Sequence, residues 1–300
     1  MPGAIRIYDT TLSQRFTWTG PVVSVDQATA IARALEQAGV STIEAGYPAQ
    51  SSSQRAIVKA VAKCISTSEV AVLAACDPAE IAAAIGAVRH AAKPLVHVYL
   101  PSGPARSGGK RVEWCRAIER AVTAVRAAGI EVQFSIGGME TMERPFRRQC
   151  IGVAVSAGAT RIAVSDSTGA MKTAAYVEMV RDIVQFVESR AIVSASCHNV
   201  SGRAVHNALA AVEAGARQVE TTAGEIGTEA GCTPLEGFVD QARGRFDVVA
   251  VDRRAAASIA ALMPANSAPA PAQTGSAARE MAAVAAPCPD WYCRVEVAAL

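Results

Sequence analysis

The sequence predicts a single (β/α)₈ barrel, in which eight parallel strands, each followed by a helix, close into a ring. Short runs rich in β-branched residues alternate eight times with longer alanine-rich segments of helical period. The chain has 300 residues, so a barrel of about 250 residues fits residues 1–245 and leaves a short C-terminal tail, residues 246–300. Its residues are 51% hydrophobic and 5% aromatic, a composition suited to parallel strands covered by helices. A doubly wound open sheet is the alternative, but eight units of even length favour closure.

Each predicted unit begins with a strand and ends with a helix. The strands are expected at Ile5–Tyr8, Thr42–Tyr47, Val70–Ala75, Leu95–Leu100, Val132–Ile136, Arg161–Ser165, Ile192–Ser196 and Gln218–Thr222. The helices are expected at Val25–Gly39, Ser53–Lys63, Pro78–Ala91, Val112–Ala128, Arg144–Ser156, Ala174–Ser189, Ala204–Ala214 and Leu235–Ala242. Four of these helices end in an Ala-Gly step, at Gly39, Gly129, Gly158 and Gly215. Glycine there supplies the left-handed residue that stops a helix before the next strand.

The tail departs from this rhythm. Val248–Met263 has room for one more strand and helix, and Pro264–Gln273 is an Ala/Pro/Ser stretch typical of a linker. A short helix at Ala277–Ala285 and an aromatic final segment, Cys288–Val297, follow. That segment is suited to an edge strand that packs on the barrel or on a partner.

Composition excludes several classes of function. The formal net charge is +2 with acidic and basic residues interspersed, so neither nucleic acid nor a membrane is expected as a partner. The N-terminal residues lack an apolar signal region, and no apolar run is long enough to span a membrane. A cytoplasmic protein is the natural expectation. The eight cysteines include no CxxC pair, which argues against a zinc knuckle or a disulfide framework.

The active site of such a barrel lies at the mouth formed by the carboxyl ends of its strands. Two histidines, several carboxylates and many hydroxyl groups fall at those ends, a set suited to a small polar or acidic substrate. The candidate substrate-binding residues are Asp9, Thr10, Gln14, Glu44, Tyr47, Ser135, Asp166, Ser167, Thr168, Ser196 and Glu220. The candidate catalytic residues are His198, Cys232, His97 and Arg15.

Several of these residues also have purely structural interpretations. Asp166, before Ser167-Thr168-Gly169, is suited to ordering a turn, and His97 lies in an otherwise apolar strand as a core histidine would. His198-Asn199 is suited to capping the next helix. The gathering of so many polar residues on one rim favours a functional interpretation.

Sequence motifs in the same order resemble the 2-isopropylmalate, citramalate and homocitrate synthases and the wider metal-dependent lyase group that includes hydroxymethylglutaryl-CoA lyase. The similar segments are Ile7–Leu12, Ile43–Ala49, Val96–Tyr99, Ser165–Gly169, Cys197–Asn199, Asn207–Ala216, Val219–Thr222, Ile226-Gly227, Ala230-Gly231 and Leu235-Glu236. The resemblance covers roughly residues 4–245. It implies a barrel that condenses an acyl-CoA with a 2-oxo acid, with an oxo-acid carboxylate bound near Ser167 and Thr168.

The resemblance also implies a divalent metal, but this chain departs at most of the ligand positions. Gln14 stands at the position of the metal-binding aspartate, and Ser13 at that of a neighbouring arginine. The first histidine of the HxH pair is replaced by Ser196, and a loop asparagine by Cys232, so that only His198 remains. An amide, a hydroxyl and a thiol are poor ligands for a hard divalent ion. No metal is therefore expected, and zinc on Cys232 and His198 would need further ligands.

Two functional hypotheses follow. The first is a divergent acyltransferase-type barrel that makes or breaks carbon–carbon bonds in acyl-CoA and 2-oxo acid substrates without the ordinary metal. In it, His198, His97 and Cys232 act as acid–base or nucleophilic groups, and Arg15 anchors an anion. The alternative is a non-catalytic synthase-like barrel that binds a metabolite. Either form is compatible with a homodimer or with pairing to a related subunit.

Overall fold

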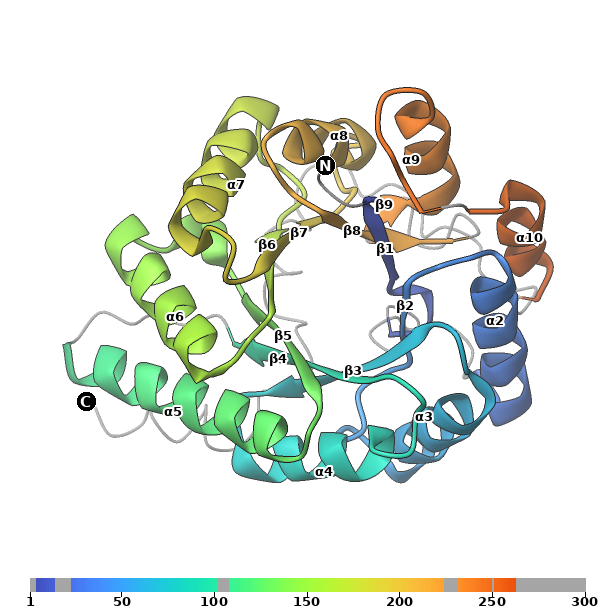
Figure 1. Ribbon diagram of the computed structural model, residues 1–300, viewed down its shortest axis with the longest axis horizontal. Helices are drawn as coiled ribbons and strands as arrows, with labels where there is room; N and C mark the ends of the chain where they lie inside the picture. Colours follow the sequence, from blue (N-terminus) through green and yellow to red (C-terminus); the bar gives the residue numbers. More distant parts are fainter. Residues whose placement is uncertain (1–3, 14–22, 102–107, 224–230, 250, 263–300) are drawn as a thin grey trace, which may run out of the picture. The chain divides into compact units, whose positions relative to one another are not determined.

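A computed structural model of the chain describes residues 4–13, 23–101, 108–223, 231–249 and 251–262. In these residues eight parallel strands form a closed ring surrounded by helices (Figure 1). The strands of the ring are β1 (Arg6–Asp9), β2 (Thr42–Glu44), β3 (Glu69–Ala75), β4 (Pro94–Leu100), β5 (Glu131–Ile136), β6 (Arg161–Asp166), β7 (Ile192–Cys197) and β8 (Gln218–Thr222).

The first strand closes the ring, because it pairs with both the second strand and the last. Tyr8 is in register with Thr42 on β2 and with Glu220 on β8, and both pairings are parallel. The predicted (β/α)₈ barrel is therefore confirmed, and the open-sheet alternative is wrong.

The helices lie on the outside of the ring and follow the strands in turn. They are α2 (Val25–Gln37), α3 (Ser52–Cys64), α4 (Pro78–Val88), α5 (Gly108–Ala127), α6 (Arg144–Ala157), α7 (Thr173–Val187), α8 (Ala204–Glu213), α9 (Leu235–Ala242) and α10 (Arg253–Ser258). Helix α2 begins with a capping box made by Ser24 and Gln27. The four glycines expected to end helices all have positive φ, from 74° at Gly129 to 114° at Gly215, as predicted.

Some boundaries differ from the sequence-based expectation. Strand β2 ends at Glu44 rather than Tyr47, because Gly46 turns the chain with a φ of 143°. Helix α5 begins four residues before the predicted Val112, at Gly108. A 3₁₀ turn, η1 (Met139–Thr141), and a two-residue strand, β9 (Thr233–Pro234), which pairs with β8, had no clear signal in the sequence.

The described residues beyond Arg245 contact the barrel. The amide of Ile5 donates to the carbonyl of Asp247 at 2.7 Å, and Ile5 forms a single parallel bridge with Val248. Helix α10 follows and packs against α2. The linker and the elements expected in residues 264–300 lie outside the described residues.

The two faces of the strands differ sharply in polarity. Residues such as Ile7, Ile43 and Val72 point outward and join the large apolar core between strands and helices. Inside the ring the apolar residues gathered together are Tyr8, Ala71 and Leu95, and most of their neighbours are polar. No helix among the described residues is long and apolar enough to cross a membrane.

Candidate active site

Three side chains in the barrel interior, in the half toward the carboxyl ends of the strands, form a hydrogen-bonded series. Glu44 Oε2 lies 3.0 Å from His97 Nδ1, and His97 Nε2 lies 2.8 Å from Ser135 Oγ. Glu44 ends β2, His97 lies on β4 and Ser135 on β5, so three strands fix the geometry. The exposed fractions are 3%, 6% and 7% respectively, so all three residues are buried. The structure thus brings together three of the predicted site residues.

Tyr8 completes this group from β1. Its hydroxyl donates to the same Glu44 oxygen at 2.5 Å, and its ring meets the His97 ring edge to face at 6.0 Å between centroids. With both Tyr8 and His97 on one carboxylate oxygen, Glu44 fixes the imidazole with its Nδ1 proton toward the carboxylate. Nε2 is then free of a proton in the neutral ring and can accept from the Ser135 hydroxyl.

The surroundings favour the charged form of His97. Burial by itself lowers the pKa of His97, but the hydrogen bond and the negative charge of Glu44, with a smaller contribution from Glu220, raise it above its ordinary value of 6.5. Burial raises the pKa of Tyr8, and the charge of Glu44 raises it further, so that Tyr8 stays protonated. The group therefore contains one acceptor carboxylate, one tunable base and two hydroxyl groups.

Glu220 forms a second polar group beside the first. Its Oε1 accepts from Gln133 Nε2 at 2.9 Å and from Ser194 Oγ at 3.4 Å. Burial raises the pKa of Glu220, although a hydrogen bond from Ser196 and the nearby His97 counteract it. Glu220 and Ser196, both predicted site residues, thus lie together with Gln133 and Ser194.

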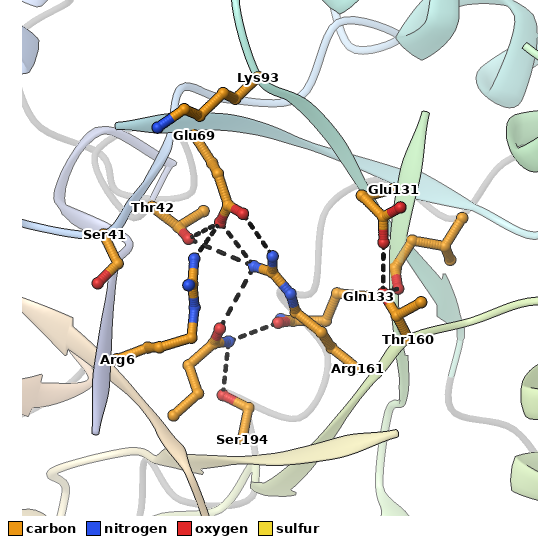
Figure 2. Close-up of polar contacts among 12 residues, drawn as sticks. Arg6, Ser41, Thr42, Glu69, Lys93, Glu131, Gln133, Thr160, Arg161 and Ser194 are labelled. Atoms are coloured by element: carbon orange, nitrogen blue, oxygen red, sulfur yellow. Dashed lines mark hydrogen bonds and ion pairs between the residues drawn. The ribbon is translucent and has the colours of Figure 1, made fainter. Parts of the chain in front are cut away.

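The floor of the barrel is closed by a charged network (Figure 2). Arg161 donates to the two oxygens of Glu69 at 2.7 and 2.5 Å, and Arg6 donates to Glu69 at 2.7 Å. The Thr42 hydroxyl adds a fourth hydrogen bond at 2.5 Å. Arg161 is also 3.4 Å from Gln218 Oε1. This network fills the amino-terminal end of the barrel, and Ser135 lies toward the opposite end, near the carboxyl end of β5.

Tyr47 occupies a separate part of the mouth. Its hydroxyl donates to Glu80 and lies 3.2 Å from the Tyr99 hydroxyl. Glu80 also accepts from the amide of Ala75 at 2.7 Å, which fixes this group to the end of β3.

The structural interpretation holds for two of the predicted positions. Asp166 accepts from the Thr168 hydroxyl at 2.9 Å and from the Met171 amide at 3.0 Å, so it orders the turn after β6. Asn199 Oδ1 accepts from the amide of Ala204, the first residue of α8, at 3.2 Å. Ser167 and Thr168 are exposed on that same turn.

The turn after β6 also supports His198. A side chain on Gly169, whose φ is +61°, would come within 2.8 Å of the His198 carbonyl oxygen, so only glycine allows this approach. The His198 amide donates to the Asp166 carbonyl at 3.3 Å. The His198 side chain is half-buried. The close backbone contact fixes where His198 leaves the end of β7.

Cys232 is buried near Thr10 and Glu220. Burial raises the pKa of its thiol, and the charge of Glu220 raises it further, so the thiol is protonated and a poor nucleophile. Thr10 donates to the carbonyl of Thr221 at 3.0 Å. Gln14 and Arg15 lie outside the described residues.

Asp9 faces away from the barrel interior. It alternates with Tyr8 on β1, and its Oδ1 accepts from the Thr11 amide at 2.9 Å. Its Oδ2 is buried without a hydrogen-bond partner, as is Thr221 Oγ1 in register with it on β8. Burial raises the pKa of Asp9 to about 7, and the hydrogen bonds from Thr11 only partly offset this. The structure separates Asp9 from the group around His97.

The donors at the implied metal positions do not fit a hard divalent ion. Ser196 offers a buried hydroxyl hydrogen-bonded to Glu220, and Cys232 offers a protonated thiol. Within the described ranges, no three His, Cys, Asp or Glu side chains are grouped so that they can hold a metal ion. Magnesium and manganese need several oxygen or nitrogen donors, ordinarily including a carboxylate. Among the described residues, the mouth therefore presents acid–base and hydroxyl groups.

Comparison with known proteins now places the chain. Residues 4–262 match the family model described as HMGL-like. The chain belongs to the HMGL-like family. Within it, 2-isopropylmalate synthases are similar in sequence: the protein from Staphylococcus epidermidis is 37% identical over 238 residues, covering 77% of this chain and 47% of that protein. The protein from Staphylococcus aureus is 37% identical over 242 residues, covering 79% and 48%. The chain thus spans about half the length of these HMGL-like relatives.

Solved structures share the barrel fold. The HMG-CoA lyase from Brucella melitensis superposes with a TM-score of 0.70 at 16% identity, covering 87% of this chain and 97% of that one. The carboxyl transferase domain Y628A of Rhizobium etli pyruvate carboxylase has a TM-score of 0.71 at 14% identity, covering 87% and 47%. At these identities the likeness establishes the fold.

Sequence reasoning missed several residues of the polar interior, namely Tyr8, Glu69, Glu80, Gln133, Ser194 and Gln218. Most of them lie away from the carboxyl ends of the strands: Glu69 and Gln218 begin β3 and β8, Gln133 and Ser194 lie within β5 and β7, and Glu80 is on α4. A period-2 count along each strand was the available signal, because it places Tyr8 on the face opposite Ile7 and Gln133 on the face of Ser135. The partners across the barrel follow only from the strand register.

Proposed function

We propose that this barrel binds a CoA thioester or a small 2-oxo acid and makes or breaks a carbon–carbon bond next to its carbonyl group, without a hard divalent metal. The carrying observation is the Glu44–His97–Ser135 series at the mouth. Sequence similarity to 2-isopropylmalate synthases supports the class of chemistry. The identity of the substrates, the order of enolate formation and carbon–carbon bond formation, and any partner subunit are part of the proposal.

His97 is the acid–base group of the proposed reaction. With Nδ1 held by Glu44, Nε2 exchanges a proton with the Ser135 hydroxyl, which lies near the carboxyl end of β5. Removal of a proton beside a thioester carbonyl gives an enolate, which attacks the 2-oxo carbonyl, and the resulting alkoxide takes up a proton. The raised pKa of His97 suits a group that both accepts and returns that proton.

The test is turnover of acyl-CoA thioesters with a panel of small 2-oxo acids, with product identified by mass spectrometry. We expect a carbon–carbon product from the wild type, and a loss of about 10²–10⁴-fold in His97→Asn. His90→Asn, at an exposed histidine, is the matched control and should retain the wild-type rate. The absence of any condensation or cleavage product across the panel would leave a metabolite-binding, non-catalytic barrel as the better description.

Metal dependence gives an independent prediction. Chelation should leave the turnover unchanged, and calorimetry with magnesium or manganese should show no saturable binding at micromolar concentrations. Zinc should also bind poorly, since Cys232 and His198 alone are two ligands and a zinc site needs further donors. Tightly held, stoichiometric magnesium or manganese that is lost in His198→Ala would contradict this prediction and restore ordinary metal-assisted chemistry.

A further inference from the structure

We infer that Ser135 is a nucleophile and that Ser135, His97 and Glu44 together catalyse acyl transfer from a thioester or activated ester through an acyl-serine. This activity does not require carbon–carbon bond chemistry and goes beyond the function proposed above. The hydroxyl, the base and the orienting carboxylate occur in one buried hydrogen-bonded series, which is the arrangement that activates a serine.

The distances match the requirement for each transfer. Ser135 Oγ lies 2.8 Å from His97 Nε2, and His97 Nδ1 lies 3.0 Å from Glu44 Oε2, both within hydrogen-bond range. Each residue comes from a different strand of a rigid barrel, so the geometry does not depend on a loop. Tyr8 donates to the same Glu44 oxygen that His97 contacts and packs edge to face on the His97 ring, which limits rotation of both groups.

The position of Ser135 suits attack on a bound ester. It is the penultimate residue of β5, and it retains 7% exposure, whereas Glu44 lies deeper at 3%. The other nucleophile proposed at this mouth, Cys232, is 1% exposed with a protonated thiol. Ser135 is therefore the better-placed nucleophile of the two.

The reaction balances with water as the final acceptor. Ser135 Oγ attacks the acyl carbonyl while its proton moves to His97 Nε2, and a C–O bond forms. The C–S bond to the thiol then breaks, and His97 returns the proton to the leaving sulfur. Water, deprotonated by His97, releases the acid and restores the Ser135 hydroxyl. Glu44 stabilises the imidazolium by its hydrogen bond and acts as a positioning residue.

The experiment uses the full chain with two probes, acetyl-CoA and an alkyl fluorophosphonate. We expect release of free CoA from acetyl-CoA, and phosphonylation of the Ser135 peptide with loss of fluoride, located by tandem mass spectrometry. Ser135→Ala should lose the label and at least about 10³-fold of the hydrolysis rate. Ser156→Ala, at an exposed serine on α6, is the matched control and should behave as the wild type.

Glu44→Gln separates catalysis from mere packing. The amide favours the wrong imidazole tautomer, so hydrolysis should fall by about 10²–10⁴-fold and the apparent pKa of the pH–rate profile should move down, with the thermal transition retained. Absence of fluorophosphonate labelling and of acetyl-CoA hydrolysis in a folded wild type would overturn the inference. So would labelling that persists in Ser135→Ala. Carbon–carbon product is measured separately, so failure here leaves the proposed condensation to stand or fall on its own assay.

Discussion

Glu69→Ala should lower the free energy of unfolding by about 3–5 kcal/mol, because it leaves a buried guanidinium without its counter-ion. Arg161 is only 8% exposed, and two of its hydrogen bonds go to Glu69. Arg6 and Thr42 lose the same acceptor. Equilibrium unfolding in urea would measure the loss.

A surface ion pair provides the control for this prediction. Glu213 and Arg245 are 2.7 Å apart, but their side chains are 56% and 49% exposed. Glu213→Ala should therefore cost less than about 1 kcal/mol. A similar small cost for both variants would mean that Arg161 finds other partners and that the floor network contributes little.

The same carboxylate predicts a response to acid. Burial opposes ionisation of Glu69, yet the hydrogen bonds and charge of Arg161, with Thr42 and Arg6, hold its pKa at about 2, below the ordinary 4.5. Its contribution to stability is then fully present above pH 4.5 and is lost as the pH falls toward 2. The cost of Glu69→Ala should shrink over that interval.

Asp9→Asn should stabilise the protein more at pH 8 than at pH 5, by about 2–3 kcal/mol. The folded pKa of Asp9 is about 7 and its ordinary value is 3.8, so the folded state holds a proton that the unfolded state releases. Wild-type stability therefore decreases as the pH rises from 4 toward 7 and levels off above it. Asparagine does not ionise, and it retains the acceptor for the Thr11 amide.

The amide also supplies a donor that does not ionise, beside the Thr221 hydroxyl, which lowers the pKa of Asp9 in the wild type. Asp9 Oδ2 and Thr221 Oγ1 are both buried without partners, and Nδ2 of an asparagine can donate to the threonine oxygen. Urea unfolding at the two pH values measures the effect, with Asp26→Asn at an exposed position of α2 as control. Equal effects of Asp9→Asn at pH 5 and pH 8 would show that Asp9 does not carry the proton.

The outer layer of the barrel was predictable because the spacing of apolar residues along each segment identifies the face that a helix or strand buries. The 3.6-residue repeat in Val25–Gly39 and the Ala-Gly steps located α2 and several helix ends within a few residues. Glu44, His97 and Ser135 were likewise visible as polar residues at strand ends. Their connection was not, since it depends on strand register and on χ angles that no local pattern encodes.

Residues with two compatible roles were harder to assign from the sequence. Asp9 and Glu44 are both carboxylates near the ends of neighbouring strands, but a single step in the pleat sends Asp9 outward and Glu44 inward. Asp166 was a candidate both for substrate binding and for ordering a turn, and the hydrogen bond from the Met171 amide shows that it orders the turn. For Asp9 and Glu44, the face of the strand on which the residue lies, rather than the residue type, decides whether the carboxylate enters the barrel.

The amide groups inside the barrel all donate in the same direction. Arg161 donates to Gln218, Gln218 donates to Gln133 at 2.7 Å, and Gln133 donates to Glu220. This series of hydrogen bonds runs in one direction, from the Arg161 guanidinium at the amino-terminal end of the barrel to the Glu220 carboxylate nearer the carboxyl ends of the strands. A change at one glutamine leaves the next donor or acceptor unmatched, so single substitutions should be costly while paired ones are tolerated. Among natural variants of this chain, positions 133, 161, 218 and 220 should therefore covary as a set, and a change that reverses one dipole should appear only with a change in its neighbours.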